Sequence, residues 1–461
     1  MRDLAFLLVF LGTVPFMFRS AMVGVMMWAY TAFLSLDDYV FGFLVGKPLN
    51  KIVAGITIFA MLFDKRRTTL RFDLTFCLMI ALLILATISS ALSPAFKMDD
   101  VWMLHGKLAK ILVYCTVIRM VVIDRFRLHA LLLAICFGMG FNAADEALKF
   151  FVSGGSHHVL GLKTIGDNNQ FALVVLMIMP ILYFLYKYMA VKIVKICTLF
   201  GLFLSVISIM ATNSRGGFIG MGTFAIVLIL LNKQKLRSLL IVAAIGTIMV
   251  QVAPPTWFER IHTIQSASGD DSFMGRVKAW KMSILVAEDR PLIGGGMHAI
   301  QDRQVWDLYW PRFNELSWIP SNEEYSPGKA AHSIFFEVLG DLGFTGLFLF
   351  TSMLLAGYRT CSGVKRLTKK RPDLHWMYDL ATMLQISLVV YIISGAALSM
   401  AYTEMLYVML TIGSVLHRFA EEAIKEDALV PPDAATVPER HPLEARPRLA
   451  QDSVDLQRPI A

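Results

Sequence analysis

The sequence predicts an all-α protein, a polytopic bundle of transmembrane helices with one large loop between two spans. Of its 461 residues, 56% are hydrophobic and 17% are charged, whereas a soluble domain is about one quarter charged. Apolar runs of roughly 20 residues, enough to cross a bilayer as a helix, recur along the chain. Residues 251–344 form the one long polar stretch ahead of the C-terminal tail. Together these observations favour a membrane protein over a soluble one.

The apolar runs define the domain organisation. The candidate spans are residues 4–18, 20–36, 50–64, 74–92, 107–123, 128–150, 169–189, 193–212, 216–232, 238–252, 332–357, 377–397 and 399–417. We expect five parts: short N-terminal spans (1–49), a transmembrane bundle (50–252), a large loop (253–331), C-terminal spans (332–418) and a tail (419–461). The tail is rich in proline and mixed charges and cannot bury a core, so we expect it to be disordered and cytoplasmic.

The net charge of +8 is a topology signal, and we expect no nucleic-acid partner. Basic residues cluster in alternate short loops, at residues 65–71, 119–127, 187–195, 233–237 and 359–371. Cytoplasmic loops carry an excess of Lys and Arg, so these loops are expected inside and the large loop outside. With the N-terminus also inside, residues 4–36 must cross only once, as one broken or re-entrant unit around Pro15 and Arg19. We favour the resulting count of about 12 spans over thirteen.

Cysteine and acidic residues give no metal or disulfide signal. The five cysteines lie in apolar spans or on the expected inner side, so no structural disulfide is predicted. Cysteines at Cys-x-x-Cys spacing are absent from the sequence, which argues against a cysteine metal site. The acid pairs Asp99–Asp100 and Asp270–Asp271 lie in expected outer segments, where adjacent acids are usually solvated. We therefore predict no metal and no cofactor.

The turn Ser214-Arg215-Gly216-Gly217 is a candidate anion site. Glycine allows close approach to the backbone, and the following helix offers free N–H groups and the positive end of its dipole. Arg215 adds a planar fork of donors that suits phosphate. The alternative is a tight turn whose arginine extends to lipid headgroups. Other arginines expected on the same face favour the phosphate interpretation.

The large loop contains a helical pattern at residues 275–285. One face carries Val277, Trp280, Ile284 and Leu285. Lys278 and Lys281 lie off that face, so the pattern predicts an amphipathic helix on the outer leaflet. Arg276, at the start of the helix, would reach either a diphosphate or a lipid phosphate, and both interpretations stay open. Arg290 follows, ahead of three consecutive glycines.

His332 begins an apolar span at the expected outer face. Its imidazole accepts a proton near neutral pH, which suits a general base acting on a sugar hydroxyl. A lone interfacial His more often caps a helix or faces water. The arginine motifs expected on the same face favour the functional interpretation of His332. Glu404 is the candidate to orient His332 or an arginine. Glu337 and Asp341 lie on another face and are expected to pair with a different helix.

Polar and aromatic side chains complete the expected outer-face site. Asp167, Asn168 and Asn169 precede an apolar span and are candidates to line a sugar site. The aromatic stretch at residues 306–318 either anchors the loop at the membrane interface or stacks on sugars.

Together these residues resemble the O-antigen ligase and O-antigen polymerase superfamily of bacterial inner-membrane glycosyltransferases. The matching pieces are Asp167-Asn168-Asn169-Gln170-Phe171-Ala172, Ser214-Arg215-Gly216-Gly217, Arg276 with Trp280, Arg290-Pro291-Leu292-Ile293-Gly294, and His332 with Asp341-Leu342-Gly343-Phe344-Thr345-Gly346. The resemblance covers roughly residues 50–417, and the order of the pieces is more specific than any single piece. The opening Met1-Arg2-Asp3-Leu4-Ala5-Phe6 resembles the exosortase-associated branch of O-glycosylation ligases.

The resemblance implies a metal-independent, inverting transfer of a glycan from a polyprenyl diphosphate carrier at the periplasmic face. Arg215 and Arg276 would hold the diphosphate, and His332 would activate the acceptor hydroxyl. The substrate-binding residues would be Asn168, Asn169, Ser214, Gly216, Arg290 and Glu404. Ser333 departs from the Asn that often follows this His in the family, so the acceptor stays open as a glycan, a lipid or a protein.

Two other functions remain as alternatives. A polysaccharide polymerase of the same superfamily would extend the carrier-linked glycan. A transporter of lipid-linked glycans would need a polar path through the bilayer centre, whereas the candidate groups collect at one face. The sequence also shows no inverted pair of spans broken by Gly or Pro, which disfavours the transporter.

Overall fold

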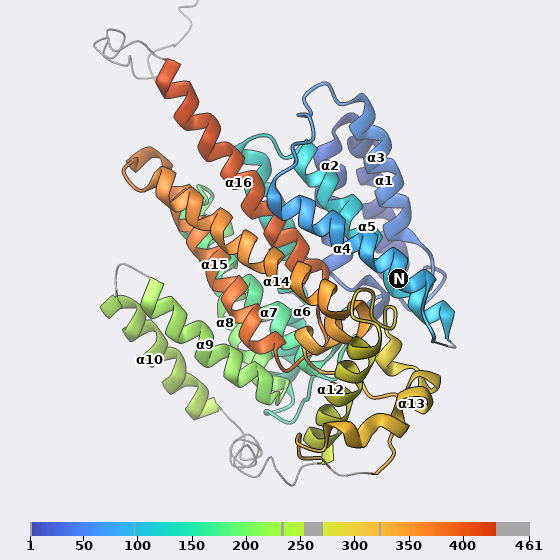
Figure 1. Ribbon diagram of the computed structural model, residues 1–461. Helices are drawn as coiled ribbons and strands as arrows, with labels where there is room; N and C mark the ends of the chain where they lie inside the picture. Colours follow the sequence, from blue (N-terminus) through green and yellow to red (C-terminus); the bar gives the residue numbers. More distant parts are fainter. Residues whose placement is uncertain (1, 96, 232–234, 253–270, 322–323, 430–461) are drawn as a thin grey trace, which may run out of the picture. The chain divides into compact units, whose positions relative to one another are not determined.

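The computed structural model of the chain describes residues 2–95, 97–231, 235–252, 271–321 and 324–429. Each predicted apolar segment is one helix, so the all-α fold class is confirmed (Figure 1). Seven helices of the described residues are long and apolar enough to cross a membrane, and four shorter apolar helices accompany them. Residues 1–420 form one compact unit, and residues 421–461 are assigned to a second.

The helices of the apolar segments are α1 (Arg2–Arg19), α2 (Ala21–Phe33), α3 (Leu49–Phe63), α4 (Leu74–Ala91), α5 (Met98–Val121), α6 (Arg125–Val152), α7 (Asn168–Tyr188), α8 (Lys192–Ala211), α9 (Arg215–Leu231), α10 (Lys235–Val252), α14 (Ile334–Thr368), α15 (His375–Gly395) and α16 (Glu404–Leu429). The large loop contains α12 (Asp271–Asp289), η3 (Ala299–Gln301), α13 (Arg303–Tyr309) and η4 (Trp310–Leu316). Two further 3-10 turns are η1 (Leu36–Asp38) and η5 (Pro372–Leu374). The described residues hold two strands, β1 (Gly161–Leu162) and β2 (Gly166–Asp167), paired antiparallel with Gly161 opposite Asp167.

The first two helices form an antiparallel hairpin, which corrects the prediction of one broken unit. The Asp3 carboxylate at the start of α1 accepts hydrogen bonds from three backbone N–H groups of residues 41–44, at 2.9–3.1 Å. This segment lies beyond the end of α2. At the far end of α1, Phe18 meets Phe59 of α3 edge-on, with 6.0 Å between ring centroids. Residues 4–36 therefore return to the end at which they begin instead of making a single crossing, and the count of about 12 spans stays a prediction.

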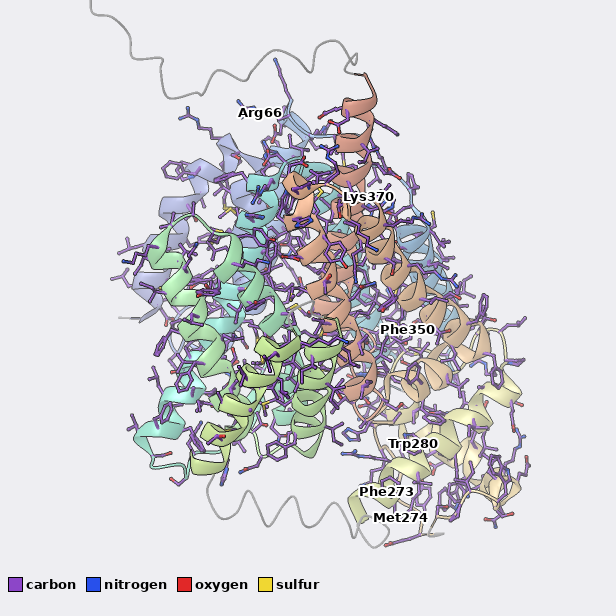
Figure 2. The ribbon with its side chains drawn as sticks, turned by 90° about the vertical axis from the view of Figure 1, so that its left-hand side faces the viewer. Arg66, Phe273, Met274, Trp280, Phe350 and Lys370 are labelled. Carbon is purple, nitrogen blue, oxygen red and sulfur yellow. The ribbon has the colours of Figure 1, made fainter. Side chains whose placement is uncertain are left out.

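The connections between helices gather at two ends of the bundle formed by residues 1–420. The first, which we call the loop end, carries residues 34–48, 92–95, 153–167, 212–214, 271–321, 324–333 and 396–403. Hydrogen bonds join its segments: the N–H of Lys163 donates to Asp38 at 3.1 Å, and the N–H of Lys97 donates to Asp302 at 2.8 Å. Arg66 lies at the opposite end, which we call the basic end (Figure 2).

Buried arginines hold the basic end together. Arg418 Nη1 donates to the carbonyl of Arg119 at 2.8 Å, and Arg127 Nη1 donates to the carbonyl of Val121 at 2.7 Å. These carbonyls belong to the last turn of α5, where cationic side chains satisfy orphan acceptors and complement the helix dipole. Arg127, which the sequence assigned to topology, therefore also fixes the packing of α5, as does Arg418.

Helix α14 is broken at Gly343, and the turn that follows α12 fills the break. Gly343 has φ 67° and ψ −167°, a conformation essentially restricted to glycine. Two N–H groups of residues 291–296 donate to the carbonyls of Gly340 and Asp341, at 2.9 Å each, and Phe344 N–H donates back to the turn at 2.9 Å. A Cβ on Gly343 would lie 2.6 Å from a carbonyl oxygen of the same turn. The large loop is thereby locked onto the first part of α14.

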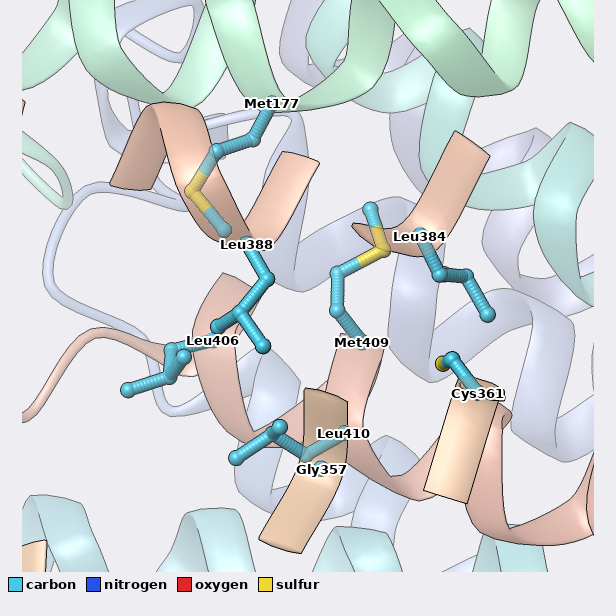
Figure 3. Close-up of a pocket in the computed structure, with 8 residues that line it drawn as sticks. All are labelled: Met177, Gly357, Cys361, Leu384, Leu388, Leu406, Met409 and Leu410. Atoms are coloured by element: carbon cyan, nitrogen blue, oxygen red, sulfur yellow. The ribbon is translucent and has the colours of Figure 1, made fainter. Parts of the chain in front are cut away.

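A small apolar cavity lies where α7, α14, α15 and α16 meet (Figure 3). It is lined by Met177, Gly357, Cys361, Leu384, Leu388, Leu406, Met409 and Leu410. A Cβ on Gly357 would come within 2.1 Å of the Leu410 side chain, so glycine allows the close approach of α14 to α16. The lining offers no charged group to orient a polar substrate, and an apolar cavity of this kind stays dry. We therefore treat it as a packing feature.

Helix α16 continues past residue 419, where the sequence predicts the tail to begin. It extends to Leu429. Glu421 and Lys425 are four residues apart on this last part, in the order that supports an isolated helix. The remainder of the predicted tail, residues 430–461, lies outside the described residues.

Reporter fusions test the N-terminal hairpin. A reporter joined ahead of Arg2 should report the same side of the membrane as reporters placed at residue 45 and after residue 310, because all three positions belong to the loop end. A reporter after residue 366, at the basic end, should report the opposite side. An N-terminal reporter that agrees with residue 366 would restore the single crossing and contradict the hairpin.

Candidate functional site

The site begins with a rigid start to α7. The Asp167 carboxylate accepts the N–H groups of Asn169 and Gln170, at 2.9 Å each, and the Gln170 side chain accepts the Asp167 N–H at 3.2 Å. This reciprocal capping box satisfies N–H groups that the first turn of a helix leaves free. A Cβ on Gly166 would lie 1.5 Å from the Gln170 oxygen, so glycine is required beside the cap. The cap therefore fixes the positions of Asn168 and Asn169, the first two residues of α7.

Asn168 and Asn169 join the start of α7 to the turn before α9. Asn168 Nδ2 donates to the carbonyl of Thr212 at 2.8 Å. Asn169 Nδ2 donates to Asn168 Oδ1 at 3.1 Å, and its own Oδ1 accepts the Ser214 hydroxyl at 2.5 Å. The Ser214 oxygen in turn accepts the N–H of Gly217 at 2.9 Å and so caps α9. Three predicted substrate-binding residues are therefore adjacent, and they also hold each other in place.

Arg215 and Gly216 form the first turn of α9. The backbone of this turn lies directly after Ser214 and therefore at the loop end. The Arg215 side chain lies outside what the structure describes, so its phosphate-binding role stays a prediction, as does that of Gly216.

His332 stands just before α14 in a left-handed backbone conformation, with φ 45°. This region disfavours most L-residues by about 1–2 kcal/mol, and such conformations cluster at functional sites. The His332 N–H donates to Ser399 Oγ at 2.8 Å. The carbonyl of Ser399 accepts the Gln170 side-chain N–H at 2.8 Å. The start of α7, the 396–403 turn and His332 are thus linked by consecutive hydrogen bonds.

The 396–403 turn, which joins α15 to α16, has further partners. The Tyr391 hydroxyl donates to the carbonyl of Met400 at 2.9 Å. The buried Glu337 carboxylate accepts the N–H of Ala401 at 2.9 Å. The sequence placed Glu337 away from His332, as a partner for another helix. Its partner is the turn between two helices, so Glu337 supports the segment that holds His332.

Arg276 and Asp167 are the charged groups that act on His332. Burial lowers the pKa of His332 below its usual value, the positive charge of Arg276 lowers it further, and the negative charge of Asp167 opposes both. At pH 7 the imidazole is therefore neutral, which is the form that a general base needs. The structure brings together two of the predicted catalytic residues. His332 lies in the segment before α14, and Arg276 lies on α12.

The position of α12 is fixed by Trp280. Its Nε1–H donates to the carbonyl of Ala331, the neighbour of His332, at 2.6 Å. Its ring stacks on Phe336 of α14, with 5.0 Å between centroids. Figure 2 shows Trp280 at the loop end. Arg276, four residues earlier on the same helix, is thereby held near His332.

The prediction of an amphipathic helix on the membrane surface is wrong for the lysine face of α12. Lys278 and Lys281 are only 3% and 2% exposed. Lys278 Nζ donates to the carbonyl of Glu324 at 2.7 Å, and Lys281 Nζ contacts Ser321 Oγ at 3.2 Å. The pattern of apolar residues identified the helix, but the lysines are covered by a later part of the same loop.

Two predicted site residues have other partners. The Arg290 guanidinium donates to the carbonyl of Leu92 and ties the end of α12 to the end of α4. The charge of Glu404 interacts electrostatically with the side chains of Tyr114 and Cys115 of α5. Binding of substrate by Arg290 stays a prediction.

The charges that act on His332 are those of Arg276 and Asp167, and the role of Glu404 in orienting His332 or an arginine stays a prediction. Asp167 is the acid near this imidazole. The sequence grouped Asp167 with the two asparagines as side chains that line a sugar site, and it gave no sign that this acid lies near His332. A signal for its capping role was present as Asp-x-x-Gln ahead of an apolar run, which is the pattern of a helix start.

Acidic pairs do not form a metal centre in the part of the chain that the structure describes. No three His, Cys, Asp or Glu side chains come together there as possible ligands. Asp99 and Asp100 lie in the first turn of α5, where acids complement the helix dipole. Asp270 lies outside the described residues, and the Asp271 side chain is likewise not described.

Two family models match parts of the chain. Residues 200–351 match the family model described as O-antigen ligase. The chain carries an O-antigen ligase domain. Residues 1–190 match a family of unknown function. No curated protein matches the chain. With its apolar helices, the chain is a multi-pass membrane protein.

The ligase domain contains only part of the candidate site. It includes the Ser214 turn, Arg276, Arg290 and His332. Asp167 and the two asparagines lie in the match to the family of unknown function, and Ser399 lies outside both matches. The hydrogen bonds from Gln170 to Ser399 and from His332 to Ser399 therefore connect three separate regions of the sequence.

Replacing Asp167 tests the electrostatic arrangement around His332. Asn also caps helices well, so Asp167→Asn should keep the start of α7 while removing the charge that raises the His332 pKa. The pKa should fall, and transfer that depends on neutral imidazole should persist to more acidic pH than in the wild type. The measurement is the pH dependence of transfer in membranes. If the acidic limb of the pH–rate profile does not move, or moves to higher pH, Asp167 is excluded as the charge that raises the His332 pKa.

Proposed function

We propose that this protein transfers a glycan from a polyprenyl diphosphate carrier to an acceptor hydroxyl at the periplasmic face of the bacterial inner membrane. The observation that carries the proposal is the placement of Arg276 of α12 near His332, through the contacts of Trp280 with Ala331 and Phe336, within the residues that match the O-antigen ligase model. In this proposal the loop end faces the periplasm, and the basic end, with its arginines and lysines, faces the cytoplasm.

The chemistry assigned to these residues is an inverting displacement. His332 takes the proton of the acceptor hydroxyl as that oxygen forms a bond to the anomeric carbon of the donor sugar. The bond from that carbon to the diphosphate oxygen breaks on the opposite side, and the diphosphate leaves on the carrier. Arg276 and Arg215 stabilise the charge that develops on the diphosphate, because guanidinium donors match phosphate oxygens. Positive charge from arginine makes the proposed reaction independent of a metal ion.

The donor half of the reaction is common to a ligase and a polymerase. The two differ in whether the acceptor hydroxyl belongs to a protein or lipid, or to another carrier-linked glycan. The exosortase-associated branch would favour a protein acceptor and stays a prediction from the opening of the sequence. A transporter is less well supported, since the candidate groups gather at one end of the helices.

Substitution of His332 tests its role as the base. Asn tolerates the left-handed backbone, so His332→Asn should keep the hydrogen bond to Ser399 and the fold while removing the imidazole. A general base contributes about 10²–10⁴-fold to rate, and transfer should fall by a factor in that range while binding of lipid-linked donor persists. The assay is transfer in membranes with matched protein levels, with donor binding measured in parallel.

The matched control is His298→Asn. His298 also has a left-handed backbone, with φ 62°, and lies at the loop end. Its charged neighbours are Asp100 and Lys107, so it is outside the proposed site and its replacement should leave transfer intact. Near-normal transfer by His332→Asn, or equal losses in the two variants, would remove His332 from the mechanism.

A further inference from the structure

Three aromatic side chains form a partly exposed surface beside Arg276 and His332. Trp280 of α12 and Phe336 of α14 are stacked, with 5.0 Å between centroids and 12° between planes. Phe273 meets Trp280 edge-on at 6.1 Å. We call these three residues the aromatic platform. Figure 2 shows Phe273 and Trp280 together at the loop end.

Helical spacing places the aromatic platform next to Arg276, and a hydrogen bond places it near His332. On α12, Phe273 precedes Arg276 by three residues and Trp280 follows it by four, so the three share one face of the helix. Phe336 lies four residues after His332. The bond from Trp280 Nε1 to the carbonyl that precedes His332 holds the two segments together. A molecule that contacts Arg276 and His332 is therefore within reach of the aromatic rings.

The aromatic platform differs from the other aromatic cluster of the loop. Phe273 is 37% exposed, and Trp280 and Phe336 are partly exposed. In the stretch at residues 306–318, by contrast, Trp306 and Phe313 are buried, and Lys281 covers the Phe313 ring at 3.8 Å. The buried part of that stretch forms the core of the loop. Trp318 in that stretch is 73% exposed, so exposure alone does not separate the two surfaces. The hydrogen bond from Trp280 to Ala331, the neighbour of His332, favours the aromatic platform for sugar stacking.

We propose that the aromatic platform binds the sugar ring that is attached to the diphosphate of the donor. The inference rests on the proposed function. The C–H face of a pyranose is apolar and rigid, and it packs flat on an aromatic ring, while its hydroxyls stay in water. Apolar and aromatic surface with a few convergent polar groups is the general composition of a small-molecule site.

Geometry favours the sugar over the polyprenyl chain as the occupant. The diphosphate has the sugar on one side and the lipid on the other. His332 acts on the acceptor hydroxyl at the anomeric carbon, so it must lie on the sugar side of the diphosphate. Phe336, which follows His332, and Trp280, which is bonded beside it, therefore flank the sugar side. Arg276, on the same face of α12, is left to contact the phosphates.

The test compares donor binding to two probes, polyprenyl diphosphate carrying a glycan and polyprenyl diphosphate alone. Phe336→Leu keeps apolar volume against Trp280 but removes the ring. It should weaken binding of the glycan-bearing probe about three- to tenfold, the size of an aromatic stacking contribution, and leave binding of the sugar-free probe unchanged. Phe336→Tyr keeps the ring and should keep the wild-type ratio. The matched control is Phe335→Leu, one residue away on a different face of α14, which should also keep it.

The outcomes separate this inference from the proposed function. Equal weakening of both probes by Phe336→Leu would mean that the ring holds the carrier or the fold, and would overturn the inference. Unchanged binding of both probes would overturn it too, as would the same loss in Phe335→Leu. If the wild-type protein binds neither probe, the proposed donor is wrong and the inference falls with it. Should Phe336→Leu fail to accumulate, Phe273→Leu provides the same comparison from α12.

Discussion

The candidate site depends on the hydrogen bond from the His332 N–H to Ser399 Oγ. The bond holds His332 in a left-handed backbone conformation that it would otherwise leave. Ser399 is itself fixed by Gln170, and the next residues of its turn are fixed by Tyr391 and Glu337. Buried polar groups among apolar helices are expensive and often indicate a transport path. Glu337 has a different use here, since it satisfies a backbone N–H that positions the turn.

A second constraint brings the large loop to the same place. The break in α14 at Gly343 leaves backbone groups free, and residues 291–296 satisfy them. This contact fixes the end of α12, and Trp280 fixes its middle through Ala331. Arg276 therefore lies on a loop segment whose contacts with α14 hold it near His332. Loops positioned by a rigid scaffold commonly carry binding residues, and here the scaffold includes the broken helix itself.

The sequence predicted the helices and the general location of the site, but not its connections. Apolar runs identified each membrane-type helix because length and composition are local properties. The single crossing of residues 4–36 was wrong because the bond from Asp3 to residues 41–44 is a tertiary contact with no periodic signal. The neighbours of Glu404 were not predictable for a similar reason: position along a helix does not give the face or the neighbour, and its charge acts on Tyr114 and Cys115 of α5. Asp167 carried a recognisable capping pattern, yet only the fold shows that its charge reaches His332.

The most direct test of this account is the catalytic rate of Ser399→Ala, measured with the donor affinity of the same protein. The substitution removes the acceptor of the His332 N–H without touching a residue assigned to the substrate. Loss of such a bond to a buried donor should lower kcat about tenfold, while donor binding stays near the wild-type value and Ser399→Thr, which keeps a hydroxyl, retains most of the rate. A kcat for Ser399→Ala equal to that of the wild type would contradict the central role of this hydrogen bond.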